Sequence, residues 1–260
     1  AVKWVIDDMS AVNQNSQDAA KPKGRTEIER IEHRTVTKEK IVGTVVIAVT
    51  GTMNRIGTTH AAISIAEFLK NTNSTVAVLE YHKSSNFKAI YNAYEDVKDE
   101  GEYFSLDGLN FYPYSENLNV IDVLEDNYNY IVLDMGINKE CDIAEFKRAN
   151  VRMVVSGVKD WELTELDYIL KTGDTIYKNL YYFNYADKVT FQEVQENMDQ
   201  CKCFMATYNP NPFLITKDTT LLFKDMLKGV IPETKQSVKK EKAKFPLSLN
   251  ILEKFKKEEK

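Results

Sequence analysis

The sequence predicts an α/β protein with a doubly wound, mostly parallel sheet and helices on both faces of that sheet. Three observations support this class. Short apolar runs rich in Val, Ile and Leu alternate with segments of helical periodicity through residues 43–230. These runs are too short for helices, and their order is typical of a sheet covered on both sides. The chain has 260 residues and is 43% hydrophobic, which is enough for one such core.

The predicted elements alternate along the chain. Strands are predicted at residues 44–49, 75–79, 109–112, 130–133, 151–155, 180–183 and 203–206. Helical periodicity predicts helices at residues 58–69, 86–94, 120–125, 143–149, 161–170, 191–198 and 219–227. Right-handed crossovers place the loops that follow the strands along one edge of the sheet. Ligands bind at that edge in folds of this class.

Composition divides the chain into three parts. Residues 1–42 are rich in charged and small polar residues and are interpreted as a linker or docking arm, before a domain at 43–232 and a basic tail at 233–260. The whole chain carries a net charge of −5, although residues 235–260 hold nine lysines and four glutamates. An acidic body predicts no sequence-specific nucleic-acid partner. The tail is expected to be solvated, with contact to an acidic partner or an anionic surface as the alternative.

Two further features bear on location. The three cysteines, Cys141, Cys201 and Cys203, are too few for a disulfide framework and lack the companions of a zinc site. The sequence shows neither a signal peptide nor an apolar stretch of the roughly 18 to 20 residues that a membrane span needs. We therefore expect a cytoplasmic protein, with peripheral membrane contact through the lysine-flanked apolar stretch at 245–252 as a further alternative.

One strand, loop and helix carry the functional hypothesis. Residues 45–60 read Val-Val-Ile-Ala-Val-Thr-Gly-Thr-Met-Asn-Arg-Ile-Gly-Thr-Thr-His, with Gly51 and Gly57 on either side of the loop. Main-chain amides in such a loop can surround phosphate oxygens, and the positive end of the following helix favours an anion. The alternative is a tight turn in a protein that never meets nucleotide.

This segment resembles the deviant Walker A region of the ParA/MinD family, a group of P-loop ATPases of the SIMIBI class whose loop ends Gly-Lys-Thr-Thr. The match places Thr58 at the phosphate lysine, Thr59 at the magnesium-binding hydroxyl and Met53 at the signature lysine, so both lysines are missing. The resemblance implies ATP or ADP and Mg²⁺ as cofactors. The implied nucleotide-binding residues of the loop are Gly51, Thr52, Asn54, Arg55, Ile56, Gly57, Thr58, Thr59 and His60.

Loss of the lysines affects binding and hydrolysis differently. A lost charged contact costs about 1.5–3 kcal/mol, which corresponds to a loss of affinity of about ten- to hundredfold. Cations that neutralise transition-state charge are worth about 10³ to 10⁵ in rate. We therefore expect nucleotide binding with weak or no hydrolysis. Arg55 is the candidate for a replacement charge, and a solvent-facing Arg55 is the alternative.

Four later segments resemble other parts of the family's site. Residues 76–82 match the strand that ends in Asp-x-Asp, with Glu80 as the candidate catalytic acid and His82 at the second acid. Residues 130–136 match Walker B, so Asp134 is the candidate that acts in catalysis and reaches magnesium together with Thr59. Asn184 falls where the family presents an Asn to adenine, and Pro210 lies in a proline-rich turn near the base.

Residues 154–163 resemble TadZ-like members, relatives that help to place pilus or secretion machinery. The resemblance implies a homodimer and a protein partner in such an apparatus, with a regulatory or positioning role. Two alternatives stay open. One is a slow ATPase, and the other is a nucleotide-free scaffold in which Met53 and Ile56 close the loop.

Overall fold

The computed structural model describes residues 43–173, 176–198 and 200–232. The predictions for residues 1–42 and for the tail at 233–260, including membrane contact through residues 245–252, lie outside the described residues. The three-part division of the chain stays a prediction.

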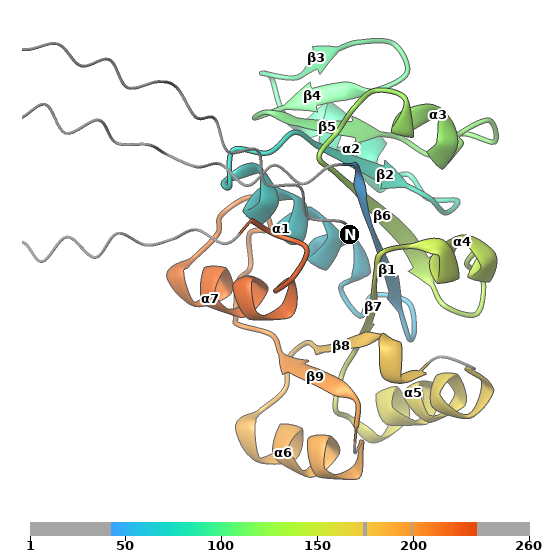
Figure 1. Ribbon diagram of the computed structural model, residues 1–260, viewed down its shortest axis with the longest axis vertical. Helices are drawn as coiled ribbons and strands as arrows, with labels where there is room; N and C mark the ends of the chain where they lie inside the picture. Colours follow the sequence, from blue (N-terminus) through green and yellow to red (C-terminus); the bar gives the residue numbers. More distant parts are fainter. Residues whose placement is uncertain (1–42, 174–175, 199, 233–260) are drawn as a thin grey trace, which may run out of the picture. The chain divides into compact units, whose positions relative to one another are not determined.

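Nine strands form one sheet in the order β3-β4-β5-β2-β6-β1-β7-β8-β9 (Figure 1). The strands are β1 Val45–Gly51, β2 Val76–Glu80, β3 Lys98–Asp99, β4 Phe104–Leu106, β5 Leu109–Tyr112, β6 Tyr130–Ile137, β7 Val151–Ser156, β8 Leu180–Phe183 and β9 Lys202–Met205. The seven strands from β5 to β9 in this order pair in parallel, and β3 and β4 add an antiparallel hairpin at one end. The doubly wound, mostly parallel sheet is confirmed.

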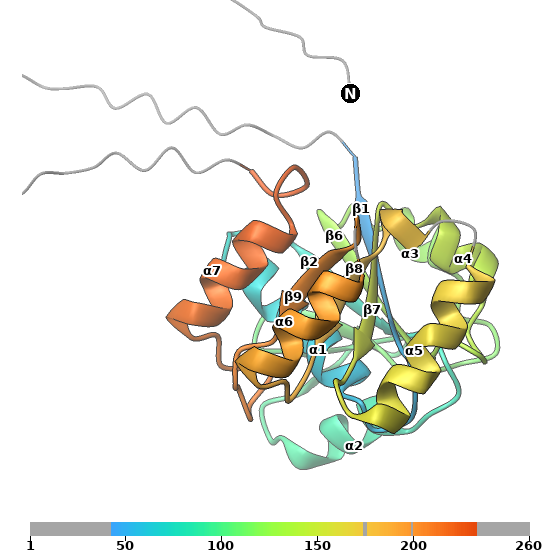
Figure 2. The same cartoon turned by 90° about the horizontal axis from the view of Figure 1, so that it is seen from below.

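Helices cover both faces of the sheet. They are α1 Thr58–Lys70, α2 Asn86–Ala93, α3 Val120–Leu124, α4 Ile143–Arg148, α5 Asp160–Thr172, α6 Lys188–Asn197 and α7 Lys217–Met226. Buried side chains of α1, α2 and α7 share one core cluster with Ile47, whereas those of α3 to α6 share the other with Ala48. Successive residues of a strand point to opposite faces, so β1 contributes to both cores. Figure 2 shows α7 on one side of the strands and α4 and α5 on the other.

Helix α1 is the best-buried helix because its small and branched apolar residues face the sheet. Ten of its 13 residues are buried. Its Phe68 packs against Phe223 of α7, with ring centroids 5.6 Å apart, so α7 fixes α1 in place. The helix begins after Gly57, which has a φ of 100°, a backbone conformation that glycine adopts without the cost of a Cβ. This fixes the direction of the helix N-terminus at the carboxyl edge of the sheet.

Most predicted bounds differ from the structure by one to three residues, and two features differ more. Strand β6 was expected to end at Leu133 but continues to Ile137, so Asp134 lies inside the strand. The cause is β1, which continues beside it and, after an irregularity, pairs Gly51 with Ile137. The hairpin of β3 and β4 was not predicted, because the two exposed residues of β3 carry no alternating apolar pattern. No described helix meets the length and apolarity needed to cross a bilayer.

Candidate functional site

The loop between β1 and α1, residues 52–57, curls back onto its own first glycine. A Cβ placed on Gly51 would come 2.2 Å from Thr58 Oγ1 and 2.7 Å from Ile56 Cγ2, so this position requires glycine. The amide of Thr52 donates to the carbonyl oxygen of Val155 at 2.9 Å, which ties the loop to β7. Arg55 has a φ of 61°, which completes the tight turn. The predicted phosphate loop is therefore a tight loop at the carboxyl edge of the sheet.

The N-terminus of α1 presents unpaired donors. The helix has no side-chain cap and no acidic residue in its first turn. In the described part of the chain, the amides of Gly57, Thr58, Thr59 and His60 meet no protein acceptor in hydrogen-bonding geometry. Unpaired amides and the positive end of the helix dipole together favour an anion. This geometry is the main observation that supports phosphate binding.

Protein side chains fill the space inside the loop. Ile56 and Thr58 are 4% and 8% exposed, and Met53 packs against the core beneath α1. Asn54 and Arg55 are exposed, and Arg55 makes no ion pair with the described residues. The positions matched to the two lysines therefore hold uncharged, mostly buried side chains. A replacement charge from Arg55 stays a prediction.

Asn184, which follows β8, holds the loop from the side. Its Nδ2 donates to the carbonyl oxygen of Ile56 at 2.7 Å, and a Cβ on Gly57 would come 2.4 Å from that nitrogen. Its own amide donates to Ser156 at 2.8 Å, which connects the end of β7 to the same point. One of the two side-chain N–H donors of Asn184 is therefore used within the protein. The predicted contact with adenine stays a prediction.

Asp134 faces a histidine at the position of the family's second acid. Its carboxylate is fully buried, and Oδ2 lies 3.5 Å from His82 Nε2 without the alignment of a hydrogen bond. Burial lowers the pKa of His82, but the charges of Asp134, Glu80 and Glu140 outweigh it and raise the pKa above its ordinary value of 6.5. A protonated His82 is thus a cation beside Asp134.

Glu80 is fully committed to protein donors. Its carboxylate accepts hydrogen bonds from the Ser84 hydroxyl, from the amides of Asn86 at 2.8 Å and Phe87 at 3.2 Å, and from the amide of Tyr114 at 3.0 Å. The side chain is buried, with the whole residue 1% exposed. These bonds cap the start of α2 and fix the loop after β5. The geometry favours a capping role for Glu80, and the predicted catalytic role stays a prediction.

The remaining predicted residues surround the first turn of α1. Thr59 Oγ1 accepts a hydrogen bond from Asn86 Nδ2 at 3.3 Å. Burial lowers the pKa of His60, and a hydrogen bond with the main chain of Asn209 offsets this only in part. Pro210 follows Asn209 and is exposed. The turn after β9 therefore reaches α1, and the place of Pro210 near the base stays a prediction.

The residues around Asp134 fit a magnesium ion poorly. Asp134 Oδ2 is a buried oxygen without a hydrogen-bond partner, which is suitable for a metal. However, the His82 imidazole, which can carry a positive charge, lies opposite this oxygen. Both carboxylate oxygens of Glu80 already accept hydrogen bonds from main-chain amides. The described residues contain no group of three or more His, Cys, Asp or Glu side chains arranged for a metal. Binding of Mg²⁺ by Thr59 and Asp134 stays a prediction.

Gly136 is a site residue that sequence reasoning missed. It has a φ of 62°, and a Cβ there would come 2.7 Å from the His82 ring, so the glycine leaves room for the imidazole. Its amide donates to Asp134 Oδ1 at 3.3 Å. The Asp-Met-Gly sequence was a signal for this, because a glycine inside a strand often marks a close approach of another group.

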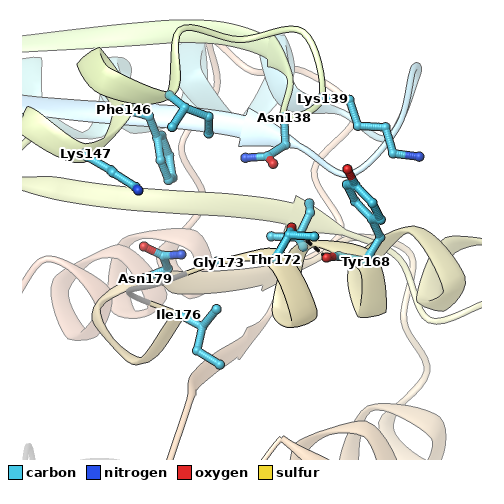
Figure 3. Close-up of a pocket in the computed structure, with 11 residues that line it drawn as sticks. Asn138, Lys139, Phe146, Lys147, Tyr168, Thr172, Gly173, Ile176 and Asn179 are labelled. Carbon is cyan, nitrogen blue, oxygen red and sulfur yellow. Dashed lines mark hydrogen bonds between the residues drawn. The ribbon is translucent and has the colours of Figure 1, made fainter.

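A separate cavity of about 220 Å³ lies between α4 and α5 (Figure 3). Phe146, Tyr168 and Asn179 contribute to its lining. None of the predicted nucleotide-binding residues lines it, so it takes no part in the site at the phosphate loop.

The fold and site define a class of α/β protein in which a parallel sheet delivers a glycine-flanked loop to a helix N-terminus. Solved structures of similar fold include MinD from Aquifex aeolicus, with a TM-score of 0.55 and 14% identity over 70% of this chain and 94% of that one. They also include the MinC:MinD cell division complex from Aquifex aeolicus, with a TM-score of 0.54 and 13% identity over 70% and 94%.

A plasmid partition protein from Borrelia burgdorferi B31 bound to AMPPNP is a third, with a TM-score of 0.50 and 14% identity over 72% and 97%. No protein-family model and no curated protein matches the sequence. At these identities the likeness shows the fold alone, and the predicted ParA/MinD-like architecture is confirmed.

Proposed function

We propose that this chain is a ParA/MinD-like protein that binds ATP or ADP with weak or no hydrolysis. We propose that it regulates or positions a larger apparatus, such as a pilus or secretion system. The observation that carries the proposal is the first turn of α1. Its amides from Gly57 to His60 have no protein acceptor, while the two lysine positions hold Met53 and Thr58.

Nucleotide binding is supported by the main-chain amide donors of the loop, which remain although the lysines are missing. A loop amide is a main-chain group, so it does not depend on the side chain at its position. A helix N-terminus stabilises an anion by about 0.3–1 kcal/mol, and the individual amide bonds add to this. We expect affinity in a range about ten- to hundredfold below that of a lysine-bearing loop.

Weak hydrolysis is supported by the residues at four positions, two at the loop and two at the end of β2. No cation replaces the lysines at Met53 and Thr58. The Glu80 carboxylate accepts four protein hydrogen bonds, so it has little capacity left to orient water. His82 faces the only carboxylate of β6. Transition-state charge therefore lacks the groups that stabilise it.

The positioning role rests on the resemblance of residues 154–163 to TadZ-like relatives. The similar fold of the plasmid partition protein and of MinD in its complex with MinC supports a partner-directed function. We propose a homodimer formed across the phosphate-loop face. With Met53 at the signature position, this dimer depends less on nucleotide than a lysine-mediated one.

A nucleotide-free scaffold is the second candidate, and one observation favours it. Ile56 and Thr58 fill the loop, and Asn184 holds it closed through the carbonyl of Ile56. If these contacts are rigid, the loop serves only to join β1 to α1. The slow ATPase is the remaining alternative and depends on Arg55.

Calorimetric titration of the full chain with ATP and with ADP, each with Mg²⁺ and with a chelator, separates these functions. The proposal expects saturable heat for ATP and no phosphate release over hours. Absence of heat at about millimolar nucleotide, where a binding free energy of about −4 kcal/mol is still detected, would establish the scaffold. Steady phosphate release that Arg55→Ala abolishes would establish the ATPase.

A further inference from the structure

The negative charge of the domain is concentrated at one end of the sheet. Residues 43–232 contain 17 basic and 27 acidic residues, a net charge of −10. Residues 95–126 alone contain ten acidic residues and one lysine, a net charge of −9. This segment, named the acidic lobe below, comprises β3, β4, β5 and α3, which lie together at one end of the molecule in Figure 1. The rest of the domain is close to neutral.

The charges of the acidic lobe are exposed and largely uncompensated. All ten acidic residues are exposed. Among the described residues, Asp107 is the one with an ion pair, to Lys70 Nζ at 3.0 Å. Like charges in such a segment repel one another, and this repulsion is relieved by a basic partner. Tyr114, Ile121 and Leu124 are also exposed, at 36%, 63% and 37%, so the surface offers apolar contacts as well.

The chain carries a basic segment that follows directly on the end of the described residues, which contact the first residue of β6. Tyr130 donates from its hydroxyl to the carbonyl oxygen of Val230 at 2.9 Å, which places the end of the described chain at the start of β6. Asp126 of the acidic lobe lies four residues before Tyr130. Residues 233–260 contain nine lysines and five glutamates, a net charge of +4, and apolar residues concentrated at 245–255. A segment of 28 residues extends up to roughly 95 Å, so it can reach the whole lobe.

We propose that the acidic lobe is the docking surface of the chain's own basic tail, residues 233–260. Lysines pair with the lobe carboxylates, and the apolar part of the tail contacts Ile121 and Leu124. Each exposed pair contributes only about 0–1 kcal/mol, but a tethered segment has an effective concentration on the order of millimolar. Several weak pairs are then sufficient. The docked tail also excludes other basic partners from the lobe. This inference does not depend on nucleotide binding.

The direct test is carbodiimide cross-linking of the full chain, which joins a lysine to a carboxylate only when they are in contact. An equal mixture of isotopically heavy and light protein distinguishes links within one chain from links between copies. We expect links within one chain from residues 235–260 to the acidic lobe at about 50 mM salt. Their yield should fall at least about tenfold near 1 M salt, where the Debye length is about 3 Å.

Charge-reversed variants test the same contact without relying on lysine chemistry. Hydrogen exchange of lobe amides is the readout. The tail variant replaces Lys239, Lys240, Lys242 and Lys244 by Glu, and the lobe variant replaces Glu95, Asp96, Glu100 and Glu102 by Lys. Each should raise exchange at residues 114–127 by about threefold or more, and their combination should restore protection. Glu193→Lys with Glu196→Lys on α6 is the matched control and should change nothing.

Three results would overturn the proposal. Links from the tail that are as frequent to α6 as to the lobe would show a non-specific contact. Links that join heavy to light chains would show that a second copy occupies the surface. Links to the lobe from lysines of residues 1–42, and not from the tail, would show that residues 1–42 occupy this surface. Because the four substituted lobe residues are exposed, the variant should retain the unfolding midpoint of the wild type.

Discussion

The imidazole of His82 lies 3.5 Å from the buried carboxylate of Asp134, at the point where β2 and β6 run side by side. A second carboxylate at this position would favour a metal ion, whereas an imidazole supplies positive charge from the protein itself. Gly136 leaves the space that the ring occupies. The positive charge next to Asp134 is thus supplied by a side chain of the protein.

His82→Gln should change the pH dependence of stability. The folded-state pKa of His82 is raised above 6.5, because Asp134, Glu80 and Glu140 outweigh the effect of burial. The stabilisation from His82 is therefore fully present below pH 6.5 and is lost as pH rises through the raised pKa. The difference in unfolding free energy between wild type and variant should decrease with rising pH. Urea unfolding across about pH 5.5 to 8 measures this difference.

The pKa of His60 is shifted in the opposite direction, because burial lowers it. It is present in both proteins and cancels in the difference. A difference that is constant, or that grows with pH, would show that His82 and Asp134 do not interact.

Gly57→Ala should be more destabilising than Gly229→Ala. The two glycines share nearly the same φ, 100° and 98°, so both substitutions carry the same backbone strain of about 1–2 kcal/mol. A Cβ on Gly229 meets nothing within 4 Å, whereas one on Gly57 displaces Asn184 Nδ2 and breaks its bond to Ile56. The excess should be about 0.5–1.5 kcal/mol by denaturant unfolding.

In an Asn184→Ala background this excess should disappear, because no hydrogen bond is left to break. Equal costs for the two glycines in the wild-type background would mean that Asn184 does not hold the loop.

Glu80→Gln should destabilise the fold by about 1–3 kcal/mol, because an amide nitrogen would oppose the donor of Tyr114 or those of Asn86 and Phe87. Glu116→Gln is the matched control, an exposed glutamate near the same turn, and should change stability by less than about 0.5 kcal/mol. Chemical denaturation of both variants measures the two costs. Equal and small effects, combined with a change in nucleotide turnover, would instead support the catalytic role.

Thr58→Lys should strengthen nucleotide binding by about ten- to hundredfold, the inverse of the cost of a lost charged contact. The position is the first residue of α1, directly after the loop. Gln192→Lys adds the same charge on exposed α6 and serves as the control. Competition with a fluorescent ATP analogue measures both affinities. If the two lysines have the same effect, the loop does not bind phosphate.

The alternation of apolar runs and helical periodicity was sufficient to predict most of the sheet. Strands β5 and β8 have the predicted bounds, and α1 is one residue longer than predicted. These elements were predictable because the spacing of their buried apolar residues can be read from the sequence. The β3 and β4 hairpin was missed because its pairing depends on the neighbouring β5 and not on its own composition.

The candidate site was predictable as a set of positions but not as a set of contacts. The sequence placed Gly51, Asp134 and Asn184 at the carboxyl edge, and the fold brings them there. That Asn184 bonds to Ile56 is a pairing across 128 positions, which no local pattern reveals. The four donors that meet Glu80 likewise come from two separate segments, the start of α2 with the loop before it and the loop after β5.

Nuclear magnetic resonance of the amides in the first turn of α1 measures phosphate binding at the loop directly. The backbone N–H signals of Gly57, Thr58, Thr59 and His60 are followed while ATP, or inorganic tripolyphosphate, is added to the full chain. We predict saturable shifts that are largest at these four amides, with either ligand and with or without Mg²⁺. Unchanged signals at these amides at saturating ligand, whether or not other residues respond, would contradict it.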